Sequence, residues 1–365
     1  MYKTLTGIIA KRISAHLEEQ SLLPAEQKGC HTGSKGCKDQ LMISKKIYED
    51  CKRRNKNLSI AWIDYQKAFD SIPHSWVEKS IELAGVNSKI VKFCKLFMEK
   101  WNTRLILKTK QKVMQSLPIQ IQRGIFQGDS LSPLLFCIAL IPLTNELNRA
   151  DCGYQVQETE RKISHLLYMD DLKLLGGNEN ELKYETKIVQ TISKDINTNF
   201  GLEKCARICL KRGSVQSKMH VRSTFENDIK ELDPRKAYNY LDIEESFDIQ
   251  QKNEKEKLKE YLRRLRLVLG TELSSKNKIQ AIGSLAVLVL RYSFGIINWH
   301  QEELHKLDTK IRKLLTIHKQ HHPKADVDCL YVPRKQGGRG LMQLKAAHAV
   351  EIRKLVEYVD RKCTR

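Results

Sequence analysis

The feature that most constrains this chain is a pair of adjacent aspartates, Asp170 and Asp171, at the junction of two short apolar runs in the sequence SHLLYMDDLKLLG. Apolar runs of this length, separated by a polar pair, are typical of two strands joined by a tight turn. We therefore expect a hairpin with Met169 and Asp170 near its tip. Mg²⁺ prefers one or two carboxylates together with phosphates and water, and such a turn offers them. A merely solvated acidic loop remains the alternative.

A second acidic position follows an apolar strand in the sequence AWIDYQKAFDSIPH. The strand delivers Asp64 at its C-terminal end, and the turn and helix after it carry Phe69 and Asp70. Two-metal phosphoryl transfer holds its cations roughly 3.5–4 Å apart and therefore needs carboxylates from separate segments. We expect Asp64 and Asp170 to meet. The alternative for Asp64 is an N-cap of the next helix, and for Asp70 a cap or an ion-pair partner.

A third segment, RGIFQGDSLSPLLF, is a glycine-containing polar loop that opens an apolar helix. Glycine at Gly124 and Gly128 permits close approach of the backbone to a ligand. Ser130 or Ser132 is expected to cap the helix. Gln127 is expected to project toward whatever lies in the cleft.

The formal net charge of +21 indicates a polyanionic partner and argues against an enzyme of small metabolites. The charge is uneven, because residues 251–365 hold 25 Lys and Arg against 12 Asp and Glu. This last third is therefore expected to bind nucleic acid, with a membrane surface as the weaker option. The most apolar stretch, residues 279–290, is too short to span a bilayer, and no secretory signal is visible. We expect an intracellular protein without a membrane partner.

The hydrophobic pattern predicts an α+β fold with an all-α end. Helices are expected at residues 5–20, 39–53, 74–84, 87–100, 131–149 and 179–200, and strands at 58–64, 103–108 and 117–122 besides the hairpin at 163–175. Beyond residue 251 strand signals nearly vanish, and helices are expected at 252–268, 275–292, 302–318 and 343–360.

Together, and in this order, the three segments resemble those of reverse transcriptases. The likeness is greatest to the polymerases of non-LTR retrotransposons, of the site-specific ribosomal-DNA-inserting type. AWIDYQKAFDSIPH is similar to the family's first catalytic segment, RGIFQGDSLSPLLF to its template-and-nucleotide loop, and YMDD to its signature hairpin. Residues 200–213 resemble the next palm segment, and residues 292–315 resemble part of the thumb.

The resemblance implies a right-hand polymerase with a palm of antiparallel sheet backed by helices. Residues 1–57 would form partial fingers, 58–245 the palm with finger segments, and 246–365 a helical basic thumb. The implied activity is that of an RNA-directed DNA polymerase, a nucleotidyltransferase. Its partners would be an RNA template, a DNA primer or RNA–DNA heteroduplex, and deoxynucleoside triphosphates.

The family pattern also implies roles for individual residues. Asp64 and Asp170 would ligate two Mg²⁺ ions, for which Mn²⁺ can substitute, with Asp171 as a supporting carboxylate. Lys204 would donate a proton to the leaving pyrophosphate.

Two further roles concern the nucleotide. Phe69 falls where the family places a bulky side chain that excludes a ribose 2′-hydroxyl, although core packing explains a phenylalanine there equally well. Gln127 and Gly128 would contact the template or the nucleotide. Paired aspartates and positive charge would also suit an RNA-dependent RNA polymerase, and Phe69 argues against that reading.

Two departures from the family pattern leave a second function open. The fingers are expected to be partial, and Asp242 stands where the family has a glycine-containing turn. The alternative is therefore a catalytically impaired retrotransposon relic that only binds RNA or other nucleic acid. The resemblance makes a nuclear location plausible, although no import signal is visible.

Overall fold

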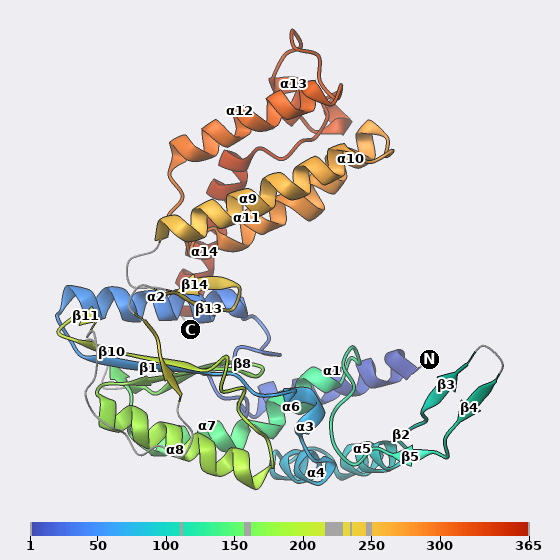
Figure 1. The fold of residues 1–365 in the computed structure, drawn as a ribbon, viewed down its shortest axis with the longest axis vertical. Coiled ribbons are helices and arrows are strands. Elements are labelled where there is room, and N and C mark those ends of the chain that lie inside the picture. The colour runs from blue at the N-terminus through green and yellow to red at the C-terminus, as the bar shows by residue number, and fades with distance from the viewer. Residues whose placement is uncertain are drawn as a thin grey trace. The chain divides into compact units, whose positions relative to one another are not determined.

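The computed structural model describes residues 2–109, 112–156, 162–215, 229–233, 236–245 and 250–363. The chain forms two compact units, Met1–Leu241 and Asp242–Arg365. The first combines helices with a sheet and the second is largely helical (Figure 1). A mixed fold of helices and strands is therefore confirmed. No helix among the described residues is long and apolar enough to cross a membrane.

The first unit is built on one sheet with the order β11-β10-β1-β9-β8, and β12 pairs with β10 in parallel. The strands are β1 (Leu58–Ile63), β8 (His165–Tyr168), β9 (Asp171–Gly176), β10 (Ala206–Lys211), β11 (Ser214–Val215) and β12 (Lys230–Glu231). All pairings along that order are antiparallel, as predicted. Strand β1 lies in the middle, and all of its residues are buried. A strand buried on both faces needs a nearly continuous apolar run, and LSIAWI provides one apart from Ser59.

The predicted hairpin is confirmed. Tyr168 pairs with Asp171, so Met169 and Asp170 form the two-residue turn between β8 and β9. The neighbouring pair across the sheet joins Ile63 of β1 to Leu172 of β9. Asp64, the residue after Ile63, therefore leaves the sheet at the same end as the turn.

Helices cover both faces of the sheet. Helix α8 (Glu179–Asp195) packs on β1 and β9, and α2 (Cys37–Arg53) packs on β8 from the other side (Figure 1). Ala61, Leu174 and Val189, from the sheet and α8, belong to the main core, which also takes in buried side chains of other helices of this unit. This two-sided cover fixes the strands whose ends carry the acidic residues.

The remaining elements of the first unit surround this core. They are α1 (Tyr2–Glu19), α3 (Ala68–Ser71), α4 (His74–Leu83), α5 (Ser88–Glu99), α6 (Ser132–Ala139), α7 (Ile141–Arg149) and the short strands β2 (Asn102–Thr103), β3 (Ile106–Lys108), β4 (Val113–Gln115), β5 (Ile119–Gln120), β6 (Tyr154–Gln155), β7 (Lys162–Ile163) and β13 (Tyr238–Tyr240). The short strands pair as β2-β5, β3-β4 and β6-β7.

Three predictions about this unit were wrong. The helix expected over 131–149 is divided at Leu140, because Pro142 in the first turn of α7 lacks the N–H that would continue it. The strand expected over 117–122 is only β5, and β4 precedes it. The helix expected over 179–200 ends at Asp195, because Asn197 adopts a φ of 54° that terminates helices.

The second unit contains β14 (Ile243–Glu245) and a set of packed helices. The helices are α9 (Gln250–Leu269), α10 (Ser275–Ala281), a π-helical segment (Ile282–Ala286), α11 (Val287–Ser293), α12 (Gln301–Ile317), α13 (Asp328–Tyr331), a 3-10 turn (Arg334–Gln336) and α14 (Leu344–Cys363). The helix expected over 275–292 is thus interrupted by the wider π turn, a change of winding that hydrophobic periodicity does not reveal.

The turn between β13 and β14 carries Asp242, where the resemblance implied a glycine-containing turn. Its backbone is left-handed. Leu241 has a φ of 49° and Asp242 a φ of 59°. A side chain in this region costs roughly 1–2 kcal/mol, less for aspartate than for most residues. Asp242 therefore occupies a position that glycine would adopt without strain.

Candidate active site

Asp64 is held at the open end of the central strand by a loop that runs beside it. Its carbonyl oxygen accepts a hydrogen bond from the Gly201 N–H at 2.8 Å, and Gln66 donates its N–H to the Asn199 carbonyl at 2.8 Å. The N-cap of α3 is Lys67, so the alternative that made Asp64 a helix cap is wrong. Asp70 lies inside α3 rather than capping it.

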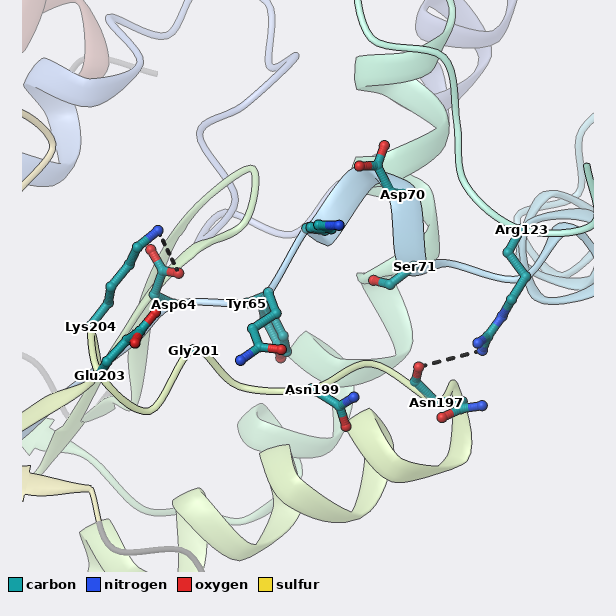
Figure 2. Close-up of a pocket in the computed structure, with 12 residues that line it drawn as sticks. Asp64, Tyr65, Asp70, Ser71, Arg123, Asn197, Asn199, Gly201, Glu203 and Lys204 are labelled. Carbon is teal, nitrogen blue, oxygen red and sulfur yellow. Dashed lines mark hydrogen bonds and ion pairs between the residues drawn. The ribbon is translucent and has the colours of Figure 1, made fainter. Parts of the chain in front are cut away.

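The same loop brings Lys204 to Asp64. The Lys204 Nζ atom lies 3.7 Å from Asp64 Oδ1, and the lysine side chain is 66% exposed (Figure 2). A Cβ at Gly201 would stand 3.0 Å from Asp64 Oδ1, so glycine allows the loop to pass close to the carboxylate. The structure therefore brings two predicted site residues, Asp64 and Lys204, into contact.

Asp170 lies at the tip of the hairpin and within electrostatic reach of both. Burial raises the pKa of the Asp170 carboxyl, and the charge of Asp64 raises it further, while Lys204 lowers it. These effects indicate that Asp64, Asp170 and Lys204 lie within electrostatic range of one another. That the two carboxylates meet as metal ligands stays a prediction. Asp171 begins β9 beside Tyr168.

The donor set fits a divalent cation that takes two protein carboxylates. Across the described parts of the chain, no three or more His, Cys, Asp or Glu side chains converge closely enough to hold a metal ion. The roles predicted for Asp64, Asp170 and Asp171 as metal ligands stay a prediction. Mg²⁺, however, commonly takes one or two carboxylates and completes its shell with water and phosphate oxygens. A cation beside Asp170 would offset the burial and the charge of Asp64, which together raise the pKa of the Asp170 carboxyl.

A cavity of about 540 Å³ opens beside Asp64 (Figure 2). Its lining combines carboxylates with cationic and amide side chains, including Asp64, Lys67, Asp70, Arg123, Asn199 and Lys204. Arg123 donates from Nη2 to the carbonyls of Ile196 and Asn197, each at 3.4 Å, where α8 ends. Lys67, Arg123 and Asn199 were not predicted to lie here, because a single polar residue in a loop has no sequence pattern that marks it.

The residues predicted to contact nucleotide or template lie apart from this lining. Phe69 is partly buried and stacks on Phe136, with ring centroids 4.4 Å apart and an interplanar angle of 14°. Gln127 is exposed, and Gly128 has a φ of 85°. The close backbone approach expected of a glycine in this loop occurs at Gly124, where a Cβ would stand 2.9 Å from the Cα of Asp70.

The predicted helix caps in this segment were wrong. The N-cap of α6 is Leu131, which makes no side-chain cap, and the buried Ser132 hydroxyl has no hydrogen-bond partner among the described residues. Pro133 in the first turn needs no N–H partner, which lessens the demand for a cap.

Comparison with curated proteins finds retrotransposon relatives. The chain is 26% identical over 195 residues to the Retrovirus-related Pol polyprotein from type-1 retrotransposable element R2 of Popillia japonica, covering 52% of this chain and 31% of that protein. It is 23% identical over 382 residues to the polyprotein from type-2 retrotransposable element R2DM of Drosophila melanogaster, covering 97% and 33%. The chain thus spans about a third of the length of these relatives.

Solved structures give a weaker likeness. The apo telomerase from Candida Tropicalis superposes with a TM-score of 0.45 at 14% identity, covering 97% of this chain and 59% of that one. Telomerase from the same organism with a TWJ fragment of telomeric RNA gives a TM-score of 0.43 at 16% identity, covering 87% and 55%.

The family itself is established by sequence. Residues 1–244 of the 365 match the family described as Reverse transcriptase (RNA-dependent DNA polymerase). This match contains the strand that ends at Asp64, the loop with Gln127, and the YMDD hairpin. The resemblance predicted from the sequence is therefore confirmed, and the chain belongs to the reverse transcriptase family.

Proposed function

We propose that this chain is an RNA-directed DNA polymerase domain of an R2-type non-LTR retrotransposon. The observation that carries the proposal is the placement of Asp64 and Asp170 at the same end of neighbouring strands, with a polar cavity beside Asp64, in a chain that belongs to the reverse transcriptase family. Nucleotidyl transfer develops negative charge on phosphate oxygens, and preorganised cations stabilise that charge.

Asp64 and Asp170 would hold the metal. Two Mg²⁺ ions, or Mn²⁺ in their place, would activate the primer hydroxyl and stabilise the leaving oxygen. Asp171 would support the site from the start of β9. Anchoring at the ends of paired strands keeps these carboxylates in place before substrate arrives, so little reorganisation is needed at the moment of reaction.

Cationic side chains around the cavity would bind the triphosphate. Lys67 and Arg123 would contact phosphate oxygens, and Lys204 would give its Nζ proton to the leaving pyrophosphate. The 3.7 Å contact with Asp64 supports this role for Lys204, because it keeps the ammonium beside the reacting centre. Positioning of this kind is worth several orders of magnitude in rate.

Nucleotide choice would depend on Phe69. Its ring is held flat against Phe136, so it has little freedom to move aside for a 2′-hydroxyl. Gln127 and Gly128, on the exposed loop before α6, would meet the template strand or the incoming nucleotide.

The organisation proposed for the chain is that of a right hand. Residues 1–57 would be partial fingers, 58–245 the palm with finger segments, and 246–365 the thumb. The thumb carries much of the excess positive charge and would contact the phosphates of a template–primer duplex without reading their sequence. The affinity for template–primer should then fall steeply as the salt concentration rises. Binding releases counterions from the phosphates, and high salt makes this release less favourable.

Primer extension tests the proposal. The purified chain is given an RNA template annealed to a DNA primer, deoxynucleotides and Mg²⁺, and compared with Asp170→Asn and Asp64→Asn variants. Asp151→Asn, on an exposed turn after α7, is the matched control. We expect extension by wild type and control and its loss, by on the order of a thousandfold or more, in both site variants.

The alternative function gives a different result. If no variant and no wild-type protein extends the primer, while all bind the template–primer in a salt-dependent manner, the chain is a nucleic-acid-binding relic. Extension that survives Asp170→Asn would show that the site lies elsewhere.

A further inference from the structure

The backbone of the YMDD turn is gripped by the side chain of Gln27. Its Oε1 atom accepts the Met169 N–H at 3.0 Å and the Gly29 N–H at 2.8 Å. Its Nε2 atom donates to the Met169 carbonyl at 3.4 Å. One amide group therefore pairs with both backbone groups of the residue that precedes Asp170. Gln27 is 2% exposed, so water does not compete for these hydrogen bonds.

Met169 needs such support because its conformation is unfavourable. Its φ is 54°, in the left-handed region that costs a residue with a side chain roughly 1–2 kcal/mol. As a turn residue it lies beyond the last pair of the β8–β9 ladder, Tyr168 with Asp171. Partly buried backbone groups without ladder partners must find others, and Gln27 supplies them.

Gln27 is itself fixed by the edge of the sheet. The Lys28 N–H donates to the Leu167 carbonyl at 2.9 Å, and the Leu167 N–H donates to the Glu26 carbonyl at 3.1 Å, so this segment runs parallel to β8. A Cβ at Gly29 would stand 2.8 Å from Gln27 Oε1 and 2.9 Å from Met169 Sδ. The glycine thus leaves room for the glutamine to reach the turn.

We propose that Gln27 is a positioning residue that sets the place of the Asp170 carboxylate at the tip of the hairpin. This rests on the proposed polymerase function. Without the Gln27 amide, Met169 loses the hydrogen bonds that this side chain makes to its N–H and carbonyl. Its backbone then relaxes from a positive φ toward more favourable angles, and this change moves the Asp170 side chain. Misplacement by about 1 Å can cost on the order of a hundredfold in rate.

Gln40 provides a matched control. It is fully buried, and its Nε2 atom donates to the Leu167 carbonyl at 2.7 Å and the Glu26 carbonyl at 2.6 Å. Gln40 therefore connects the segment that holds Glu26 to strand β8 at Leu167, and its hydrogen bonds do not reach Met169. Gln27→Met and Gln40→Met each keep side-chain volume and remove the hydrogen bonds, so both should lose similar folded stability.

The test compares these variants by two measurements. Hydrogen exchange of the Met169 amide should speed up on the order of tenfold or more in Gln27→Met and stay near the wild-type value in Gln40→Met. Single-turnover extension should slow on the order of a hundredfold in Gln27→Met alone, with unchanged affinity for template–primer.

Equal effects of the two substitutions on exchange would overturn the role of Gln27, because they would show only loss of stability. Extension by Gln27→Met at the wild-type rate would also overturn it. The exchange measurement requires no turnover. Inactivity of the wild-type chain would therefore count against the polymerase function alone, while exchange still decides whether Gln27 holds the turn.

Discussion

The Nζ atom of Lys204 lies 3.7 Å from Oδ1 of Asp64. Gly201 allows the loop that carries Lys204 to pass close beside this carboxylate. Lys204 also lowers the pKa of Asp170, whereas Asp64 raises it. One exposed ammonium therefore lessens the electrostatic repulsion between the two carboxylates that we propose as metal ligands.

Replacing Lys204 should change the pH dependence of extension. Lys204→Gln removes a charge that lowers the pKa of Asp170, so this pKa should rise further. As the solution is acidified, Asp170 should then become protonated at a higher pH than in the wild type. The acid limb of the single-turnover rate profile should move to higher pH, and the maximal rate should fall on the order of a hundredfold through loss of the acid. Lys204→Arg keeps the charge and should leave the acid limb near its wild-type position. A profile of Lys204→Gln superimposable on the wild type would exclude this electrostatic role.

Two glycines of the loop before α6 should differ in their tolerance of alanine. Gly124 has a φ of 87° and a Cβ there would stand 2.9 Å from the backbone of Asp70, so Gly124→Ala combines strain with a clash. Gly128 has a φ of 85° but open space around its Cβ position within the described structure. We expect Gly128→Ala to cost about 1 kcal/mol and Gly124→Ala about 3 kcal/mol in free energy of unfolding. Urea denaturation measures both, and equal losses would contradict the close approach of Gly124 to Asp70.

Glu185 should make stability fall as pH rises. Burial raises the pKa of its carboxyl from 4.5 to about 9, and the charge of Glu181 adds to the shift. The folded state then binds a proton that the unfolded state releases above 4.5. This contribution is fully present below about pH 4.5 and is lost progressively up to about pH 9, at up to about 1.4 kcal/mol for each pH unit.

Glu185→Gln should remove that dependence. The variant should be more stable than the wild type near neutral pH, and the difference in free energy of unfolding should grow with pH. Glu49→Gln, on an exposed part of α2, serves as the control and should leave the pH dependence as it is. A wild-type curve that does not fall relative to the Glu185→Gln variant would show that Glu185 is ionised.

Shortening Phe69 should relax the choice of sugar. Phe69→Ala removes the ring that stacks on Phe136 and should raise ribonucleotide incorporation relative to deoxynucleotide incorporation on the order of tenfold or more. The variant should also lose about 3 kcal/mol of stability through the cavity it leaves. Phe69→Tyr retains the bulk and should retain discrimination. An unchanged preference in Phe69→Ala would assign the ring to core packing alone.

The positions of Asp64 and Asp170 could be predicted from the sequence, because each lies where an apolar pattern stops. The strand ending at Asp64 and the hairpin around Asp170 follow from runs of buried residues, and the structure has both. The elements that were wrongly predicted depend on local backbone conformation. Pro142 divides one expected helix, and Asn197, with its left-handed backbone, ends another.

Contacts formed by isolated polar residues could not be foreseen. Gln27 and Arg123 lie in loops, where no periodicity fixes the direction of a side chain, and their partners are far away in the sequence. The reason for a glycine two residues after Gln27 is visible only in the structure, where a Cβ at Gly29 would clash with both Gln27 and Met169. Long-range hydrogen bonds of this kind are set by tertiary packing, which a single sequence does not display.

Strand β1 is hydrogen-bonded along both edges, to β9 and to β10. Segments in that position open only when most of the surrounding structure opens with them. Asp64, directly after this strand, should therefore open only with the fold, while Lys204 and Gln127 lie in loops outside the sheet. On heating, Asp64 should therefore keep its place until the sheet unfolds, whereas the loops that carry Lys204 and Gln127 should loosen at a lower temperature.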